Sequence, residues 1–294
     1  MSNKRKGIIN AAIAYILWGL YPLYWWQLQH IAPTETLVNR MIWSFITLLL
    51  ITLVLRKFSL LIDTVKELLT DKKRLLLLII ATVLISINWF VYTWAVVHVR
   101  VLEAGLGYYI SPILSFIIGA FILKEKLNRL QILASCIATI GVLFKTISYG
   151  VFPWISLILA ASFAFYGLCK KLIKVNAFFS LFLETTLMLP VALFFFSHLL
   201  ITGESTFLTG DMRPIIFLIG AGAVTVSPLF FFGKATQLAP LKIVGFMQYI
   251  GPTIGMFIAI FVMGEPFSMT RFISFAIIWL ACIIFTISQF KPEA

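Results

Sequence analysis

A short sequence pattern occurs twice in this chain, in the same order and at a constant spacing. The pattern Tyr-Ile-x-Pro fills residues 109–112 and returns at residues 249–252, 140 residues later. A glutamate follows each proline by thirteen residues, at Glu125 and at Glu265. A repeat of this length indicates two copies of one structural unit, and we expect the site that serves the chain to lie where the copies meet.

Long apolar stretches fill almost the whole chain and predict membrane helices. Hydrophobic residues make up 61% of the sequence and charged residues 12%, whereas soluble domains carry about 25% charged residues. A helix needs about 20 apolar residues to cross the hydrocarbon core of a bilayer. Ten stretches come close to or exceed that length: residues 8–28, 35–55, 75–97, 103–123, 129–147, 152–170, 177–198, 214–233, 241–263 and 270–290.

The ten predicted spans define the fold class, an all-α integral membrane protein. Continuous apolar runs of this length favour helices, because a β-barrel would show shorter segments of alternating hydrophobicity. Five spans fall in residues 1–150 and five in residues 151–294. Because five is odd, the second copy would enter the membrane upside down relative to the first. We therefore predict ten transmembrane helices, arranged as an inverted five-plus-five repeat within one membrane domain.

Basic residues are distributed unevenly over the predicted loops. If the N-terminus is cytoplasmic, 18 of the 23 Lys and Arg fall on the inside, four fall outside, and Arg40 lies within a span. The positive-inside rule then places both termini in the cytoplasm. This placement accounts for the net charge of +12 without a nucleic-acid partner and makes the lipid bilayer the main surroundings of the chain. Trp25 and Trp26, at the outer end of the first span, are typical of an interfacial anchor and not of a signal-peptide cleavage site.

The sequence lacks the motifs of ATP-driven and metal-dependent proteins. It contains no G-x-x-x-x-G-K-[ST] loop for ATP phosphates and no H-E-x-x-H pair for zinc. Cys136, Cys169 and Cys282 each stand alone within a span, which predicts neither disulfides nor a metal site. We therefore expect no cofactor and no use of ATP. An intramembrane enzyme with paired carboxylates as acid and base is a weaker alternative, because no nucleophile or metal ligand accompanies them.

Three charged residues, Arg40, Glu103 and Glu184, lie inside predicted spans or at their ends. A charge at the bilayer centre costs about 2.5–3.5 kcal/mol on insertion scales, so each is a candidate for an electrostatic or coupling role. Arg40 and Glu184 occupy corresponding spans of the two halves, which predicts a buried ion pair. The pair would act either as a structural clamp or as a site for an anionic group or a proton. Glu103 begins the fourth span, where it either balances the helix dipole or acts as a gate.

Aromatic and amide side chains recur within several spans. On facing helices they would enclose a cavity suited to an amphipathic solute with a ring or alkyl part. The alternative is that they only form hydrogen bonds between helices, worth about 1 kcal/mol or less each. The predicted cavity residues are Trp18, Tyr21, Asn88, Trp89, Tyr92, Tyr108, Tyr109, Tyr166, Gln248 and Tyr249.

Prolines and glycines within these spans predict local deformability. A proline frees a backbone carbonyl in a helix, which is tolerated where that carbonyl faces protein or a wet cavity. Small residues also recur every four positions from residue 107 to 119 and from residue 251 to 259, a spacing typical of close helix packing. The predicted gating-helix residues are Gly107, Pro112, Pro228, Gly251 and Pro252.

Two segments between spans are predicted to lie outside the bilayer. Residues 58–71 place Leu61 and Leu68 on one face, which favours a short helix on the cytoplasmic surface of the membrane. Residues 199–213 are rich in Gly, Ser and acidic residues and are predicted to form a solvated connector.

Several short motifs, spread over nearly the whole chain, are specific when taken together. They are residues 18–19 (Trp-Gly), 40–44 (Arg-x-x-Trp-Ser), 102–108 (Leu-Glu-Ala-x-x-Gly-Tyr), 162–167 (Ser-Phe-x-Phe-Tyr-Gly) and 245–253 (Gly-Phe-x-Gln-Tyr-Ile-Gly-Pro-Thr). On these motifs the chain resembles the RarD subgroup of the EamA family, within the drug/metabolite transporter superfamily. The resemblance implies a ten-helix, inverted five-plus-five transporter of the inner membrane that exports metabolites or toxic compounds. An association of the subgroup with chloramphenicol suggests amphipathic drugs as cargo.

These observations predict a secondary transporter that carries a small-molecule substrate by alternating access. Proton coupling through Glu103 or Glu184 is one hypothesis, and facilitated diffusion is the alternative. A scaffold or accessory protein of an envelope complex is the rival interpretation from a different functional class. The sequence leaves open whether the chain acts alone or as a homodimer.

Overall fold

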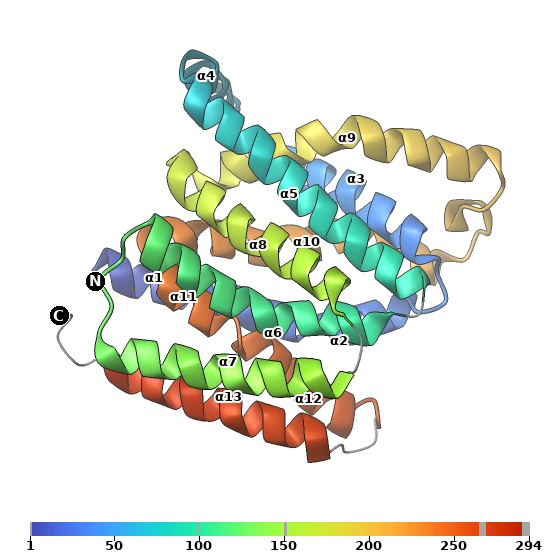
Figure 1. Ribbon diagram of the computed structural model, residues 1–294. Helices are drawn as coiled ribbons and strands as arrows, with labels where there is room; N and C mark the ends of the chain where they lie inside the picture. The colour runs from blue at the N-terminus through green and yellow to red at the C-terminus, as the bar shows by residue number, and fades with distance from the viewer. Residues whose placement is uncertain (1, 99, 150–151, 265–268, 290–294) are drawn as a thin grey trace.

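The structure is a computed structural model that describes residues 2–98, 100–149, 152–264 and 269–289. All regular secondary structure in these residues is helical, which confirms the predicted all-α class (Figure 1). Glu265, the second glutamate of the repeat, lies outside the described residues. The elements are α1 (Asn3–Gly19), α2 (Tyr21–Trp25), η1 (Trp26–Leu28), α3 (Pro33–Val54), α4 (Phe58–Thr70), α5 (Lys72–Val97), α6 (Val101–Ile117), η2 (Ile118–Ile122), α7 (Arg129–Tyr149), α8 (Trp154–Ile173), α9 (Ala177–Ile201), η3 (Thr206–Leu208), α10 (Met212–Leu238), α11 (Leu241–Met247), α12 (Ile250–Phe261) and α13 (Met269–Ser288).

Eight helices or helix runs in the described residues are long and apolar enough to cross a membrane. They coincide with eight of the predicted spans. In the other two ranges, 129–147 and 270–290, the apolar segments Arg129–Phe144 and Phe272–Ser288 are shorter. The multi-pass helical fold therefore agrees with the sequence, whereas the count of ten spans and their inverted arrangement stay predictions.

Two of the spans are broken near their middle. The first span changes from α1 to α2 at Leu20, and the run from α11 to α12 is interrupted at Gln248 and Tyr249. Broken helices leave backbone groups without their usual helical partners, which a membrane tolerates only inside protein or beside a wet cavity. Both breaks are therefore places to look for a site.

Helices from the first half of the chain pack mainly on helices from the second half. α1 packs on α10 and on α12, while α5 and α6 both pack on α8. α3 contacts α9, and α7 lies along α13 at the edge of the bundle (Figure 1). In the predicted repeat, α1 corresponds to α8, α3 to α9, α5 to α10, α6 to α11 and α12, and α7 to α13. When each helix is replaced by its counterpart, the same set of packing pairs results.

Close approach of α3 and α10 depends on Gly222. A Cβ atom at Gly222 would lie 2.2 Å from the carbonyl carbon and oxygen of Trp43 and 2.7 Å from the amide nitrogen of Ser44. Because these are backbone atoms, an added methyl group cannot be accommodated by turning a side chain. The two helices would have to separate.

We expect Gly222→Ala to lower the free energy of unfolding by about 1–3 kcal/mol, the usual effect of overpacking. Gly255→Ala is the matched control, because a Cβ atom at Gly255 meets nothing within 4 Å. Thermal unfolding of the two variants in the same detergent measures the difference. Equal midpoints for the two variants would contradict the close packing described here.

Small residues also bring α6 against α8 and α11, as the four-residue spacing in residues 107–119 predicted, whereas Cβ atoms at Gly251 and Gly255 in the second set would meet nothing closer than 3.5 Å. A Cβ atom at Gly107 would lie 2.9 Å from the Cβ atom of Leu159 in α8. On another face of α6, a Cβ atom at Gly245 in α11 would lie 2.6 Å from that of Ser115. The helix that carries several of the predicted cavity residues is thus held tightly on two sides.

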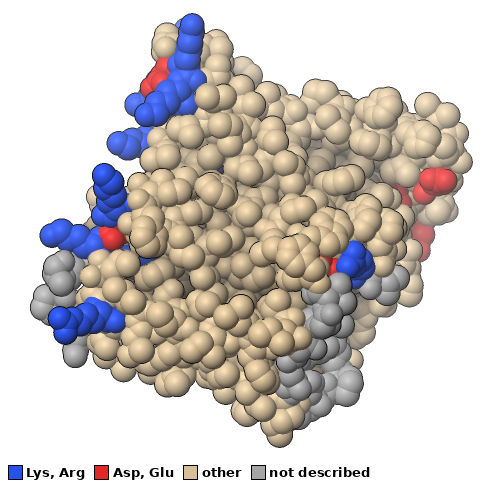
Figure 2. Space-filling view, in the orientation of Figure 1, with Lys and Arg blue, Asp and Glu red and all other residues tan. Residues whose placement is uncertain are grey.

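Charged side chains gather at the ends of the helices. Figure 2 shows Lys and Arg concentrated at the end of the molecule where α1 begins and where α4 projects. The predicted short helix in residues 58–71 is present as α4, with Leu61 and Leu68 buried. Arg74 pairs with Glu67 and Asp71 and fixes the junction between α4 and α5.

The segment 199–213 differs from the solvated connector that the sequence predicted. Its centre is buried against the start of α3, where Glu35 accepts hydrogen bonds from the Thr206 amide nitrogen and hydroxyl, each at 2.7 Å, and from the Ser205 hydroxyl at 3.1 Å. A buried carboxylate needs such partners. Composition alone did not reveal that a glutamate from another span would supply the acceptor.

Candidate functional site

A cavity of about 520 Å³ lies between the helices of the two halves. Its walls come from α1, α2, α3, α5 and α6 of the first half, and from α8, α10 and the α11–α12 break of the second half. Pockets that bind small molecules typically measure about 300–1,000 Å³. The cavity is therefore large enough for a small organic solute.

Most of the predicted cavity residues meet at this one place. Of the residues predicted from the sequence to line a cavity, to set its charge or to lie on gating helices, eleven line it: Trp18, Tyr21, Arg40, Asn88, Trp89, Tyr92, Tyr108, Tyr109, Gln248, Gly251 and Pro252. They come from segments far apart in the sequence, so their convergence is a property of the fold. Their role in binding a solute stays a prediction.

Other predicted site residues do not line this cavity. Tyr166 and Glu184 are hydrogen-bonded to each other instead. The Tyr249 hydroxyl donates to the Tyr109 carbonyl oxygen at 3.2 Å. The remaining residues of this group are Glu103, Gly107, Pro112 and Pro228, which lie within α6 and α10 away from the cavity lining.

Half of the 22 lining residues were missed or misread from the sequence, and three of them are instructive. Trp25 was interpreted as an interfacial anchor but forms part of the cavity wall. Thr225 and Phe163 also line it. Thr225, a polar residue three positions before Pro228 in an apolar span, offered a usable signal, whereas nothing distinguishes Phe163 from the other phenylalanines of the chain.

Arg40 is held in the cavity wall by aromatic rings and one hydroxyl. Its guanidinium carbon lies 4.9 Å from the ring centroid of Trp25 and 4.8 Å from that of Trp89, in cation–π geometry. Its Nε donates to the Thr225 hydroxyl at 3.2 Å. No ion pair joins Arg40 to a carboxylate within the described part of the chain, so the predicted pair with Glu184 was wrong.

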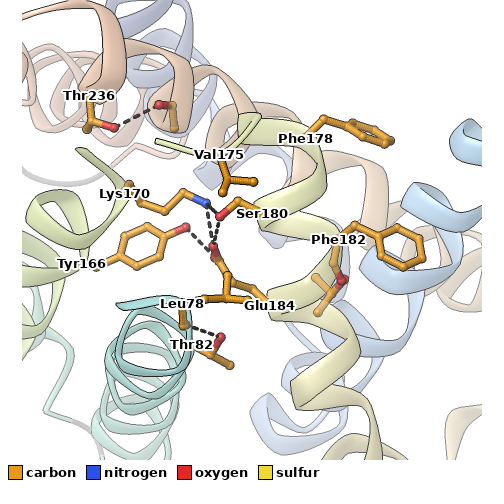
Figure 3. Close-up of polar contacts among 12 residues, drawn as sticks. Leu78, Thr82, Tyr166, Lys170, Val175, Phe178, Ser180, Phe182, Glu184 and Thr236 are labelled. Atoms are coloured by element: carbon orange, nitrogen blue, oxygen red, sulfur yellow. Dashed lines mark hydrogen bonds and ion pairs between the residues drawn. The ribbon is translucent and has the colours of Figure 1, made fainter. Parts of the chain in front are cut away.

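Glu184 instead pairs with Lys170, as Figure 3 shows. Lys170 Nζ lies 2.5 Å from Glu184 Oε1, and both side chains are 1% exposed. The Ser180 hydroxyl donates to the same oxygen at 2.9 Å, and the Tyr166 hydroxyl donates to Oε2 at 3.0 Å. The carboxylate is thus neutralised and fully hydrogen-bonded between α8 and α9, which favours the structural-clamp alternative for Glu184.

Glu103 ties the start of α6 to the start of α8. Its Oε1 accepts from the Ile155 amide at 3.0 Å, and its Oε2 lies 2.8 Å from Arg100 Nη2. The Ser156 hydroxyl donates to the Glu103 carbonyl oxygen at 2.5 Å. A carboxylate in this position complements the helix dipole of α8 as well as that of α6. The residues on both sides of it in α6, Val101 and Gly105, line the cavity.

The two predicted amides make contacts between helices at the cavity wall. Asn88 Nδ2 donates to the Leu159 carbonyl oxygen at 2.9 Å and to the Ser162 hydroxyl at 3.0 Å. Gln248 Oε1 accepts from the Ser111 hydroxyl at 3.3 Å. The sequence left two alternatives for these amides, cavity lining and hydrogen bonding between helices. Asn88 and Gln248 do both.

Comparison with known proteins identifies the family. A sequence model described as the EamA-like transporter family matches residues 5–147. The protein named "Uncharacterized transporter YojE" of Bacillus subtilis (strain 168) is 42% identical over 99% of this chain and 96% of its own length. The chain belongs to the EamA-like transporter family. Protein RarD of Escherichia coli (strain K12) is a further EamA relative, 36% identical over 98% of this chain and 96% of its own length.

A solved crystal structure supports the fold of this EamA protein. It matches with a TM-score of 0.75 over 99% of this chain and 100% of its own, at 14% sequence identity. At that identity the likeness concerns the fold alone. Together with the family, the apolar helices describe a multi-pass membrane transporter with a small-molecule substrate and the lipid bilayer as its surroundings.

An aromatic cluster closes the EamA cavity on one side. It consists of Tyr15, Trp18, Phe163, Tyr166 and Phe232, with neighbouring ring centroids 5.0–6.3 Å apart. Three of these residues line the cavity, and Tyr166 reaches Glu184 behind it. The cluster therefore separates the cavity from the Lys170–Glu184 pair.

Beyond the cluster, at the end rich in basic residues, Glu125 joins the two halves of the EamA chain. Its Oε1 accepts from the Leu241 amide at 2.6 Å and its Oε2 from the Lys242 amide at 3.0 Å, so it caps α11. Lys171 Nζ lies 3.7 Å from Glu125 Oε1 and donates to the Ala239 carbonyl oxygen at 2.7 Å. We refer to Glu125, Lys171 and the start of α11 as the inner latch.

Proposed function

We propose that this protein is a secondary transporter of the inner (plasma) membrane that exports small amphipathic metabolites or drugs by alternating access. The observation that carries the proposal is the cavity of about 520 Å³ at the seam between the two halves, lined by aromatic rings, amides and one arginine. Transporters built from two repeats place their substrate site at that seam.

The proposed mechanism uses residues 1–150 and 151–294 as two inverted units that rock about the cavity. Support comes from the packing pairs, which map onto themselves when the halves are exchanged, as α1 on α10 maps to α8 on α5. Support also comes from the repeated pattern at residues 109–112 and 249–252. The broken helices at Leu20 and Gln248 lie beside the cavity, where inverted-repeat transporters use such breaks.

The proposed orientation places both termini in the cytoplasm. The basic end of the molecule, where α1 begins and α4 projects, would face the cytoplasm by the positive-inside rule (Figure 2). Inner-latch residues lie toward that end, whereas α2 and the start of α6, which carry the lining residues Trp25 and Val101, lie toward the other (Figure 1). This arrangement corresponds to a state that is closed inside and open outside.

We propose that the energy comes from a proton gradient and not from ATP, with Glu103 as the better candidate for coupling. Glu103 lies at the cavity end of α6, and Arg100 is the one described residue that contacts its Oε2 atom. Glu184 is separated from the cavity by the aromatic cluster and already pairs with Lys170. Glu103→Gln would then remove the dependence of transport on the proton gradient.

The test is solute release from liposomes that contain only this protein. The liposomes are loaded with chloramphenicol and a mixture of small aromatic acids, amides and amines, and release is followed by mass spectrometry with and without a proton gradient. We expect at least one solute to leave faster than from protein-free liposomes, and to leave more slowly once a protonophore collapses the gradient.

The outcomes separate the parts of the proposal. If the rate of solute release does not depend on the proton gradient, proton coupling is wrong and facilitated diffusion is the mechanism. Release of no solute, from protein that is folded by thermal unfolding, would contradict the transporter mechanism and favour an accessory role.

A further inference from the structure

Among the described residues that line the cavity, Arg40 is the one that carries a charge. A guanidinium keeps its charge under all physiological conditions. A charge at this depth in a membrane protein needs a partner or water, because burial without compensation is expensive. The cavity therefore carries a fixed positive charge, and the described residues of its walls supply no opposite charge.

The buried glutamates of the described residues, Glu35, Glu103 and Glu184, are all engaged elsewhere. Glu35 binds Ser205 and Thr206, Glu103 binds Arg100 and the start of α8, and Glu184 binds Lys170. None of them forms an ion pair with Arg40. An anion that neutralises Arg40 has to come from outside the described chain.

The bonding of Arg40 leaves the right atoms free for such an anion. Only Nε has a hydrogen-bond acceptor in the described structure, the Thr225 hydroxyl. Trp25 and Trp89 lie over the guanidinium carbon and hold the group in place. The terminal nitrogens Nη1 and Nη2 donate to no described residue. Two neighbouring nitrogens of one guanidinium match the two oxygens of a carboxylate.

The rest of the cavity favours a flat apolar body on that anion. Trp18 and Phe163 form part of its closed side, with ring centroids 5.6 Å apart. Tyr92 and Tyr108 stand on another wall, 6.2 Å apart. Aromatic walls of this kind bind rings through offset and edge-to-face contacts. A dianion such as a phosphate monoester would keep an uncompensated negative charge, because the lining residues that the structure describes include one cation.

We infer that the cavity selects small organic monoanions, with a carboxylate bound by Arg40 and an aromatic or flat apolar body held by the aromatic walls. This inference rests on the proposed function and narrows its substrate class. It assigns Arg40 as the residue that determines charge specificity. The counterpart solutes, in which an amide or an amine replaces the carboxylate, are bound weakly or not at all.

The test measures binding to the purified full-length protein in detergent. The probes are phenylacetate, 3-phenylpropionate and 4-phenylbutyrate, each with its amide and its amine of the same skeleton, and the readout is the shift of the thermal unfolding midpoint with probe concentration. For at least one skeleton we expect the acid to bind about tenfold or more tightly than its amide, as expected for a charged hydrogen-bond pair, and the amine to give no shift.

Variants of Arg40 show whether this residue causes the preference. In Arg40→Gln the ratio of acid to amide affinity should fall to about one, whereas Arg40→Lys, which keeps the charge but not the two-nitrogen fork, should retain part of it. A ratio that persists in Arg40→Gln would overturn the inference. Amides or amines that bind as tightly as the acids would overturn it too, as would no binding by any probe up to about 10 mM, a concentration that detects very weak complexes.

The binding test and the liposome test fail separately. Acid preference in a protein that moves no solute would uphold the anion site and refute the transport proposal. Solute release without acid preference would do the reverse.

Discussion

Replacing Gly105 with tryptophan is expected to abolish transport while the protein stays folded. Gly105 lines the cavity from α6, and a Cβ atom at this position meets nothing within 4 Å. The indole would therefore grow into open space and occupy the volume that a solute needs. We expect solute release from liposomes to fall by about 100-fold, comparable to losing 2.7 kcal/mol of transition-state stabilisation. The unfolding midpoint should change little.

The matched control adds the same ring elsewhere. Phe90 in α5 is 63% exposed on the outer surface of the helix bundle, so Phe90→Trp should leave release unchanged. Release at the normal rate in Gly105→Trp would show that the solute does not pass through this cavity. A misfolded Gly105→Trp protein would contradict the open space seen around this residue.

Removing Glu184 is expected to destabilise the protein more than any other single change considered. Glu184→Ala leaves Lys170 charged, 1% exposed and without its carboxylate. Breaking a buried ion pair in this way typically costs about 3–5 kcal/mol, because the remaining charge is uncompensated. Unfolding by heat or denaturant in detergent measures the loss.

A double variant tests whether stability requires the ion pair itself or only the absence of an unpaired buried charge. Replacing both partners, as in Lys170→Met with Glu184→Met, removes the two charges together and should recover most of the lost stability, since apolar replacements of buried pairs are often neutral or better. A double variant no more stable than Glu184→Ala would argue that the hydrogen bond from Tyr166 to Glu184, and not the charge, holds α8 to α9.

The failed prediction about Glu184 shows what the sequence lacks. The sixth predicted span, residues 152–170, ended at Lys170, and this lysine was counted among the basic residues on the inside. The helix α8 instead continues to Ile173, and Lys170 turns inward to Glu184. The end of a span can be predicted from the sequence only to within about one helical turn. That uncertainty concealed Lys170 as the partner of Glu184.

Helix ranges and shared composition were predictable, but the rotation of each helix was not. The repeat placed Tyr109 and Tyr249 as equivalents, yet Tyr109 lines the cavity and Tyr249 turns into the core against it. Trp25 and Trp26 are adjacent, and only Trp25 faces Arg40. Which side of a helix faces a cavity depends on packing between distant segments, which a single sequence does not record.

If the protein works by the proposed alternating access, the inner latch sets a threshold on what can be carried. Glu125 accepts hydrogen bonds from two main-chain amides of α11, so these bonds do not depend on the side chains of α11. Two hydrogen bonds to a charged acceptor are worth roughly 3–6 kcal/mol together. If the inner end opens during the cycle, the cargo must favour the open form by a comparable amount. Weakly bound solutes would then enter the cavity without being transported across the membrane. The protein would therefore select among solutes at the opening step as well as at binding.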